Sequence, residues 1–228
     1  MKVAAITGAY GGLGAALSKA LAKKGYKLVL GGRDGAALEK FAAEVRGLTD
    51  VAAVTMDVRS KSDCERLVDA AVEKFGRLDL LINNAGVWDL ASFEETSEAQ
   101  LREMFETNFF GPFFCSQAAV RLMKKQGSGH MLNIGSTAAV DYKTALIAYG
   151  TSKAALIALT NFLRGELKGT GIRVSVFSPG GIKTGVFRRH PEMLKSDYME
   201  PSFVAGKIIE HIENPTDDWH VILKRPVA

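Results

Sequence analysis

Tyr149 and Lys153 are the two side chains whose types and spacing first suggest catalysis. They lie four residues apart in residues 148–168, a stretch whose apolar pattern predicts a helix, so both side chains share one helix face. A free tyrosine has a pKa near ~10, which is too high for efficient proton transfer at neutral pH. A neighbouring ammonium lowers this pKa, so the pair could act as a general acid or base. Taken alone, the pair also fits an aromatic side chain beside a cation on an exposed helix.

A glycine-rich turn near the N-terminus is the second candidate for chemistry. It reads Thr7-Gly8-Ala9-Tyr10-Gly11-Gly12-Leu13-Gly14, and it follows a predicted strand and opens a predicted helix. Glycine lets a phosphate approach the backbone closely, and the first turn of a helix offers N–H groups and a positive dipole end. The same turn could simply pack a helix against a strand, but its context favours a dinucleotide site.

Polar and glycine-containing segments follow other predicted strands in the same way. They are Asn83-Asn84-Ala85-Gly86 after the fourth strand, Ser136 after the fifth, and Pro179-Gly180-Gly181-Ile182-Lys183-Thr184 after the sixth. Taken alone, Ser136 is typical of a turn or a helix cap. The neighbours of Ser136 do not form a GxSxG elbow, so a serine hydrolase is disfavoured.

The elements that must position these residues alternate along the chain. Apolar runs predict strands at residues 3–6, 27–30, 51–56, 78–82, 130–134, 173–177 and 220–223. Periodic patterns predict helices at residues 12–24, 36–46, 61–75, 97–125, 148–168 and 201–212, with a bend at Gly111-Pro112. This alternation predicts an α/β fold: a single Rossmann-type, doubly wound parallel sheet of about seven strands with helices on both faces.

Composition narrows the class of protein. The 228 residues suit one domain, residues 1–228, and a net charge of +4 without a basic cluster argues against nucleic acid. Cys64 and Cys115 show neither disulfide-framework nor zinc spacing, so no metal is expected. No stretch has the length of a membrane span or a signal peptide, so we expect a cytoplasmic protein without a membrane partner.

The motifs together resemble the short-chain dehydrogenase/reductase family. The TGxxxGxG turn, the Asn-Asn-Ala-Gly segment, Ser136, Tyr149-Gly150-Thr151-Ser152-Lys153 and the PGxxxT-like segment occur in the family's order between residues 7 and 184. The resemblance implies NAD(P)-dependent, reversible hydride transfer between a carbonyl and an alcohol, most readily reduction of an aldehyde or ketone with NADPH.

The resemblance also assigns roles to individual residues. Tyr149 would be the general acid or base, Lys153 would tune it and hold the nicotinamide ribose, and Ser136 would position the substrate oxygen. Asn108 would anchor a water that connects Lys153 to solvent. The cofactor-binding residues it implies are Gly8, Tyr10, Gly12, Leu13, Gly14, Arg33, Asp57, Val58, Asn84, Ala85, Gly86, Tyr149, Lys153, Pro179, Gly180, Ile182 and Thr184.

Two signals bear on the choice of nicotinamide. Glycine occupies the position after the second strand where NAD enzymes of the family carry an acid, and Arg33 follows it, which suits a 2′-phosphate. The glycine turn lacks the basic residue of many NADP enzymes, and Arg33 could instead pair with Asp34. We expect NADP(H), with NAD(H) possible. Asp57 would contact adenine, or it could lie in a turn whose next helix is capped by Ser60 or Ser62.

The substrate region is predicted less sharply. By analogy it comprises Trp88, residues 138–142 and a short lid at about residues 185–200. Lid and flanking residues Lys183, Arg188, Arg189, His190 and Lys195 are basic, which could favour an acidic substrate or an acyl carrier protein, or they could simply be solvated. A 3-oxoacyl-thioester reductase is therefore an alternative to a general carbonyl reductase.

Two further readings concern assembly and a non-enzymatic role. The predicted helix at 148–168 is apolar on nearly all sides, which favours a homo-oligomer through the family's four-helix contact; the C-terminal residues 221–228 favour a dimer over a tetramer. A non-enzymatic NADP(H) sensor is a remote alternative. A sensor would be expected to have lost the catalytic serine, tyrosine and lysine, and all three are present in this sequence.

Overall fold

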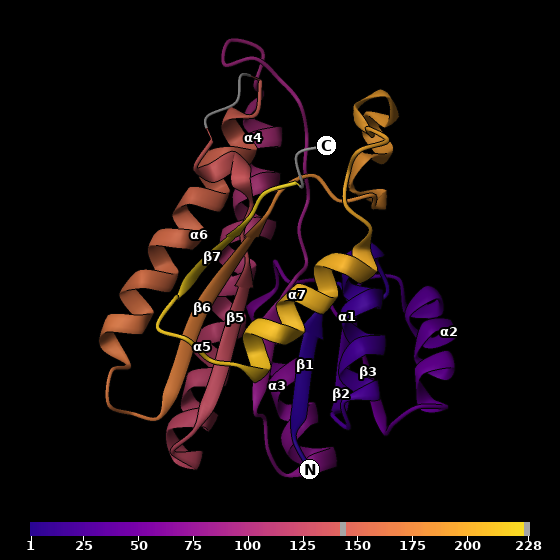
Figure 1. The fold of residues 1–228 in the computed structure, drawn as a ribbon, viewed down its shortest axis with the longest axis vertical. Helices are drawn as coiled ribbons and strands as arrows, with labels where there is room; N and C mark the ends of the chain where they lie inside the picture. The colour runs from indigo at the N-terminus through magenta and orange to yellow at the C-terminus, as the bar shows by residue number, and fades with distance from the viewer. Residues whose placement is uncertain (142–144, 226–228) are drawn as a thin grey trace.

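The protein is built around a seven-stranded parallel sheet (Figure 1). The computed structural model describes residues 1–141 and 145–225, without the side chain of Arg188. The strand order is β3-β2-β1-β4-β5-β6-β7, and every neighbouring pair is parallel. The strands are β1 (Val3–Thr7), β2 (Lys27–Gly32), β3 (Val51–Thr55), β4 (Leu80–Asn83), β5 (Gly129–Ile134), β6 (Ile172–Pro179) and β7 (His220–Leu223).

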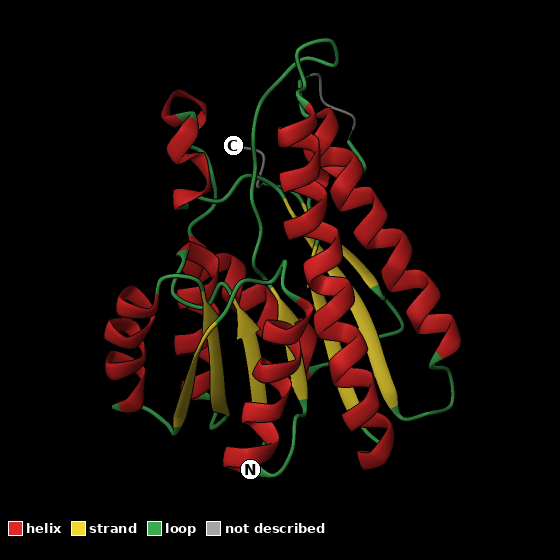
Figure 2. Cartoon of the chain, turned by 180° about the vertical axis from the view of Figure 1, so that it is seen from behind, coloured by secondary structure: helices red, strands yellow, loops and turns green. Residues whose placement is uncertain are grey.

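Helices cover both faces of this sheet (Figures 1 and 2). They are α1 (Gly12–Lys23), α2 (Gly35–Arg46), α3 (Lys61–Phe75), α4 (Glu98–Phe105), α5 (Gly111–Gln126), α6 (Ile147–Glu166) and α7 (Pro201–Glu213). Side chains of α1, α2 and α7 form one core with one face of the strands, whereas α3, α5 and α6 pack on the other. Alternate residues of β1 enter opposite cores, Ala4 and Ile6 the first, Val3 and Ala5 the second. The predicted doubly wound fold is confirmed.

The long helix predicted at residues 97–125 is present, but its irregular part differs from the prediction. Ser97 caps α4 in a reciprocal pair with Gln100, and α5 ends at Gln126. Between α4 and α5 lies a π-helical turn, Glu106–Phe110. The departure from α-helical geometry therefore precedes Gly111-Pro112 rather than falling on it. Pro112 has no N–H to donate to the carbonyl of residue 108, so the chain widens in the turn before it.

The strand order reverses between β1 and β4, and this reversal places the candidate site. The chain runs outward from β1 to β3 on one side and from β4 to β7 on the other. Loops after β1 and β4 therefore diverge and leave a crevice at the carboxyl ends of the strands, where ligands of such sheets bind. Both cysteines, Cys64 on α3 and Cys115 on α5, are buried and free. In residues 1–141 and 145–225, no helix is long and apolar enough to cross a membrane.

Candidate active site

A cavity of about 1020 Å³ opens at the carboxyl ends of the strands. Its walls collect the sequence-predicted residues from seven segments that are separate in the chain. Those that line it are Gly8, Tyr10, Gly12, Leu13, Gly14, Arg33, Asp57, Val58, Asn84, Ala85, Gly86, Ser136, Tyr149, Lys153, Pro179, Gly180, Ile182 and Thr184. Asn108 is the exception, because it is fully buried behind the wall.

The glycine turn after β1 has no room for larger side chains. A Cβ on Gly14 would lie 2.1 Å from the carbonyl oxygen of Gly8, whose own φ of +63° is in the left-handed region. A Cβ on Gly12 would lie 2.5 Å from the methyl carbon of Thr184, so the segment after β6 packs directly on the turn. Gly11 precedes α1 without a side-chain cap, and the first residues of α1 line the cavity. This geometry fits a pyrophosphate.

Hydrogen bonds join the turn after β1 to the segment after β4. The Thr7 hydroxyl accepts from the backbone N–H groups of Asn84 and Ala85, both at 3.0 Å. In return, Nδ2 of Asn84 donates to the carbonyl oxygens of Thr7 and Gly8, at 2.9 and 3.1 Å. Two motifs whose bonded residues are 77 positions apart in the sequence thus form one structural unit.

Tyr149 and Lys153 lie on the first turns of α6, facing the same cavity. Lys153 is 4% exposed, and its Nζ donates to the carbonyl oxygen of Ile134, the last residue of β5, at 2.8 Å. Ser136 follows β5 by two residues, and its hydroxyl accepts from the N–H of Ala138 at 3.2 Å. Ser136 therefore caps the short 3₁₀ turn that follows it, as the sequence allows, and it also lines the cavity.

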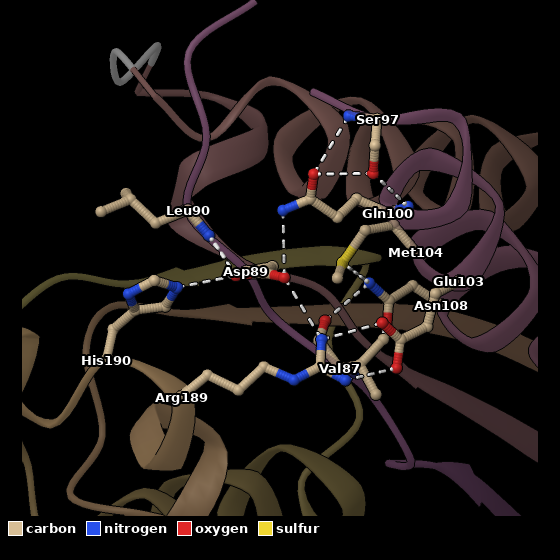
Figure 3. Close-up of polar contacts among 10 residues, drawn as sticks. All are labelled: Val87, Asp89, Leu90, Ser97, Gln100, Glu103, Met104, Asn108, Arg189 and His190. Atoms are coloured by element: carbon tan, nitrogen blue, oxygen red, sulfur yellow. Dashed lines mark hydrogen bonds and ion pairs between the residues drawn. The ribbon is translucent and has the colours of Figure 1, made fainter. Parts of the chain in front are cut away.

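Asn108 sits in the π-helical turn and connects the loop after β4 to α6. Its side chain exchanges two hydrogen bonds with the backbone of Val87, each at 2.9 Å (Figure 3). It also donates to the Ser152 hydroxyl at 3.1 Å. Gly86 separates Asn108 from Lys153, because a Cβ there would lie 3.2 Å from Oδ1 of Asn108 and 3.5 Å from Nζ of Lys153.

Comparison with known proteins now identifies the family. Residues 2–195 match the model of the family described as "short chain dehydrogenase". The chain belongs to the short-chain dehydrogenase family. It is 36% identical to an uncharacterized oxidoreductase of Methylorubrum extorquens, over 95% of this chain and 86% of that one.

Solved structures agree with this membership. One is an alcohol dehydrogenase of Thermococcus sibiricus complexed with 5-hydroxy-NADP (TM-score 0.90, 31% identity, 100% of this chain and 97% of that one). Another is the 3-ketoacyl-(acyl-carrier-protein) reductase of Brucella melitensis complexed with NADH (TM-score 0.86, 27% identity, 98% and 96%). The short-chain dehydrogenase fold expected from the motifs is confirmed, and the chain is an oxidoreductase of this family.

Burial determines the electrostatics of the pair on α6. Removal from water lowers the pKa of Lys153 from 10.5 to about 8. Burial also raises the pKa of Tyr149, while the Ser136 side chain acts in the opposite direction. The lowering of the Tyr149 pKa expected from its spacing to Lys153 is therefore not found in this short-chain dehydrogenase. Desolvation of the phenol is the largest cause of the raised pKa, and the Lys153 ammonium is directed toward the carbonyl oxygen of Ile134.

Two alternatives left open by the sequence concern Arg33 and Asp57, which line the cavity after β2 and β3. Asp34 caps α2 by accepting from the N–H of Ala37 at 3.0 Å, and no ion pair joins it to Arg33 in the described part of the chain. Arg33 is exposed on the cavity rim. Ser60 caps α3. Asp57 lies in the preceding turn, where hydrogen bonds from Arg59 hold the pKa of its carboxyl below the usual value.

Tyr10 contributes a contact that the sequence did not reveal. Its ring lies over Gly32, where a Cβ would be 2.4 Å from a ring carbon, and its hydroxyl accepts from the N–H of Asp34 at 3.2 Å. Gly32 is the position at which NAD enzymes of the family were expected to carry an acid. Because the Tyr10 ring fills that space, a side chain at this position would require it to move.

The region predicted to bind substrate, Trp88 and the segment after β6, contains side chains that contact each other. Trp88 is 7% exposed and packs edge-on against Phe187 and His190. Two of the basic residues predicted there form ion pairs, Lys183 with Glu200 and Arg189 with Glu103, and His190 contacts Asp89 at 2.7 Å. Tyr142, predicted to border the substrate, lies outside the described residues, as does the side chain of Arg188.

Sequence reasoning missed several residues of the cavity wall: Thr107, Leu146, Lys224 and Arg225. Lys224 and Arg225 directly follow β7, so the rule applied to the other strand ends would have found them. Thr107 and Leu146 carry no comparable signal. No cluster of three or more potential metal ligands occurs in residues 1–141 and 145–225.

The buried ammonium predicts a measurable cost in stability. Since the pKa of Lys153 falls from 10.5 to about 8 on folding, the unfolded chain binds more protons between these pH values, and stability rises with pH there. Lys153→Met should raise the free energy of unfolding at pH 7 by about 1 to 3 kcal/mol, after the lost hydrogen bond is counted.

Urea unfolding of both proteins at several pH values tests this expectation. The gain should shrink as the pH rises above about 8, where the native ammonium loses its proton. Lys168→Met, at an exposed lysine just after α6, is the matched control and should show no such gain. Equal stability of wild type and Lys153→Met at pH 7 would contradict the assigned cost of burial.

Proposed function

We propose that this short-chain dehydrogenase reduces an aldehyde or ketone to an alcohol with NADPH, reversibly. One observation supports this proposal above all: the same cavity is lined by the glycine turn and by Ser136, Tyr149 and Lys153. Structural neighbours that hold an NADP analogue or NADH support a nicotinamide cofactor.

The residues present fit such a cofactor along the whole cavity. The turn at Gly12, Leu13 and Gly14 would bind the pyrophosphate, and Asp57 and Val58 would border the adenine. Asn84, Ala85 and Gly86, with the segment of Pro179, Gly180, Ile182 and Thr184, would enclose the nicotinamide half. When bound, the nicotinamide supplies or accepts the hydride.

The protein itself handles the proton and the carbonyl oxygen. The Ser136 hydroxyl donates a hydrogen bond to that oxygen and holds it beside the phenol of Tyr149. During reduction, the Tyr149 hydroxyl gives its proton to the oxygen as hydride reaches the carbon, so that C=O becomes CH–OH. The Lys153 ammonium stabilises the phenolate that forms and binds the ribose. A raised pKa keeps Tyr149 protonated before this step, as a general acid requires.

Asn108 would complete the proton path through its main chain. Its side-chain amide is already engaged by Val87 and Ser152, so a water held here would bind its carbonyl oxygen. Pro112, four residues later, has no N–H for that carbonyl. The proline in the sequence thus leaves this carbonyl oxygen without the donor that an α-helix would supply.

Preference for NADP(H) rests on Arg33 and Tyr10. Arg33 lies exposed at the rim without an ion pair in the described part of the chain, and the Tyr10 ring covers the position of the acid expected in NAD enzymes. A guanidinium can bind a 2′-phosphate through two hydrogen bonds. NAD(H) is the alternative cofactor.

A 3-oxoacyl-thioester reductase is the second candidate activity, supported by the similar Brucella melitensis reductase. A panel of simple aldehydes, cyclic ketones, diketones and a 3-oxoacyl thioester, each assayed by NADPH oxidation, separates the two. Tight NADPH binding without turnover of any of them would favour the non-enzymatic sensor.

Replacing the proposed acid gives the direct test of mechanism. Tyr149→Phe should lower kcat by at least about a hundredfold, because the variant lacks the hydroxyl that is proposed to supply the proton. NADPH affinity, measured by quenching of protein fluorescence, should be retained, since the ring remains. Turnover close to that of wild type would refute the assignment.

The cofactor preference can be tested at Arg33. Arg33→Ala should weaken NADPH binding by about tenfold or more while changing NADH binding by less than about threefold, because only NADPH carries the 2′-phosphate. Arg66→Ala is the matched control, since Arg66 is exposed nearby but bonded to Asp63. Equal losses for both cofactors would overturn the preference.

We also propose that the protein assembles with copies of itself through α5 and α6. Apolar side chains are exposed along this side: Phe162 (78%), Phe110 (44%), Ile147 (40%) and Phe113 (38%). Such an exposed apolar patch is typical of an interface.

Sedimentation velocity tests this assembly. Phe162→Glu should shift the protein toward monomer, since a charge would be buried in the interface. Phe203→Glu is the matched control, because Phe203 is exposed on α7, on the opposite face of the sheet. A monomeric wild type would contradict the proposal.

A further inference from the structure

Three aromatic rings from separate parts of the chain form a continuous row beside the catalytic residues. Trp88 follows β4, Phe187 lies in the 3₁₀ turn Gly185–Arg189, and Tyr198 comes before α7. The ring centroids of Trp88 and Phe187 are 5.1 Å apart, and those of Phe187 and Tyr198 are 5.3 Å apart. All three line the cavity that also holds Tyr149. We call this row the aromatic wall.

The wall is fixed in place at both ends. Asp89, next to Trp88, accepts from Nε2 of His190 at 2.7 Å and pairs with Arg189 at 3.3 Å (Figure 3). Arg189 also makes a two-pronged ion pair with Glu103 on α4, at 2.8 and 2.9 Å. At the other end, the Tyr198 ring lies where a Cβ on Gly181 would be, 2.5 Å from ring carbons, and Arg225 covers its face at 5.3 Å.

The charges around the wall are already neutralised. Arg189 is paired with Glu103 and Asp89, Lys224 with Asp141, and Arg225 with Asp197. Three further cations that line the cavity, Arg33, Lys153 and Lys195, have no ion pair in the described part of the chain. Arg33 follows β2 and Lys153 lies on α6, so Lys195 is the one on the segment that carries Phe187 and Tyr198. A substrate carboxylate would have to compete with carboxylates that belong to the protein. An uncharged, apolar body would instead cover the rings.

Resting on the proposed function, we infer that Trp88, Phe187 and Tyr198 bind the substrate body and select uncharged carbonyl compounds that carry an aromatic or planar apolar group. Asp89 and Glu103 are positioning residues: they act through Arg189 and His190, which hold Phe187 against Trp88. The ion pairs span 86 to 101 residues of sequence, so they fix the segment after β6 relative to α4.

Three methyl ketones with the same reacting end test this inference. Butanone ends in hydrogen where benzylacetone carries a phenyl ring and laevulinate a carboxylate. The wild type should show kcat/KM for benzylacetone at least about tenfold above that for laevulinate, mainly through KM. A second series, benzaldehyde against glyoxylate, repeats the comparison with aldehydes. The inference would be overturned if the wild type preferred laevulinate to benzylacetone, or glyoxylate to benzaldehyde, and if Lys195→Met lost that preference.

Variants test whether this selectivity depends on the aromatic wall and on the residues that position it. Trp88→Ala and Phe187→Ala should reduce kcat/KM for benzylacetone by about tenfold, and by less for butanone. Glu103→Gln should raise KM for benzylacetone about threefold or more without an equal fall in kcat, and Glu103→Asp should recover part of the loss. Glu98→Gln is the matched control, because it breaks an ion pair with Arg102 on the same helix, away from the wall.

Different results would overturn the substrate inference and the proposed function. Turnover that depends on Tyr149 but shows the same selectivity in wild type, Trp88→Ala and Phe187→Ala would overturn the inference and leave the proposed function intact. Absence of turnover in both series and in the panel, with NADPH bound, would count against the proposed function itself. Glu103→Gln carries the test of positioning, with its unfolding temperature as the check on folding.

Discussion

The hydrogen bonds that join Thr7 and Gly8 to Asn84 and Ala85 are the interaction on which the site depends. They connect the ends of β1 and β4 at the point where the strand order reverses, through four contacts of 2.9 to 3.1 Å. Because these two strand ends are fixed, the loops that leave them diverge and keep the cavity open. The close approach of Gly14 to the Gly8 carbonyl holds the glycine turn beneath it. Loss of this junction would alter every other part of the site.

A second constraint is the buried Lys153. The protein places an ammonium where burial lowers its pKa to about 8, with the Ile134 carbonyl as its hydrogen-bond acceptor. This is destabilising near neutral pH, and a functional role accounts for such a group better than a structural one does. Gly86 lies between Lys153 and Asn108, and Asn108 belongs to the π-helical turn. The glycine and the irregular helix therefore both border the buried ammonium.

Much of this arrangement could be predicted from the sequence. Apolar runs located all seven strands to within two or three residues, and the positive φ of Gly76 ends α3 where the pattern predicted. The rule that parallel strands end at one edge brought Ser136, Asn84 and the glycine turn together correctly. Burial could not be read from spacing, so the direction of the Tyr149 shift was wrong. The pairing of Arg189 with Glu103, and the ring of Tyr10 over Gly32, depend on contacts between distant segments that no local pattern encodes.

We propose that hydride passes between a nicotinamide and a carbonyl in this cavity while the protein supplies the proton. NADPH deuterated at either face of the transferring carbon, with mass spectrometry of the alcohol formed, tests this proposal. We expect one deuterium on the carbinol carbon from one of the two labelled cofactors, and no labelled alcohol with Tyr149→Phe over the same period. Alcohol without deuterium from either cofactor, while NADPH is consumed, would contradict it.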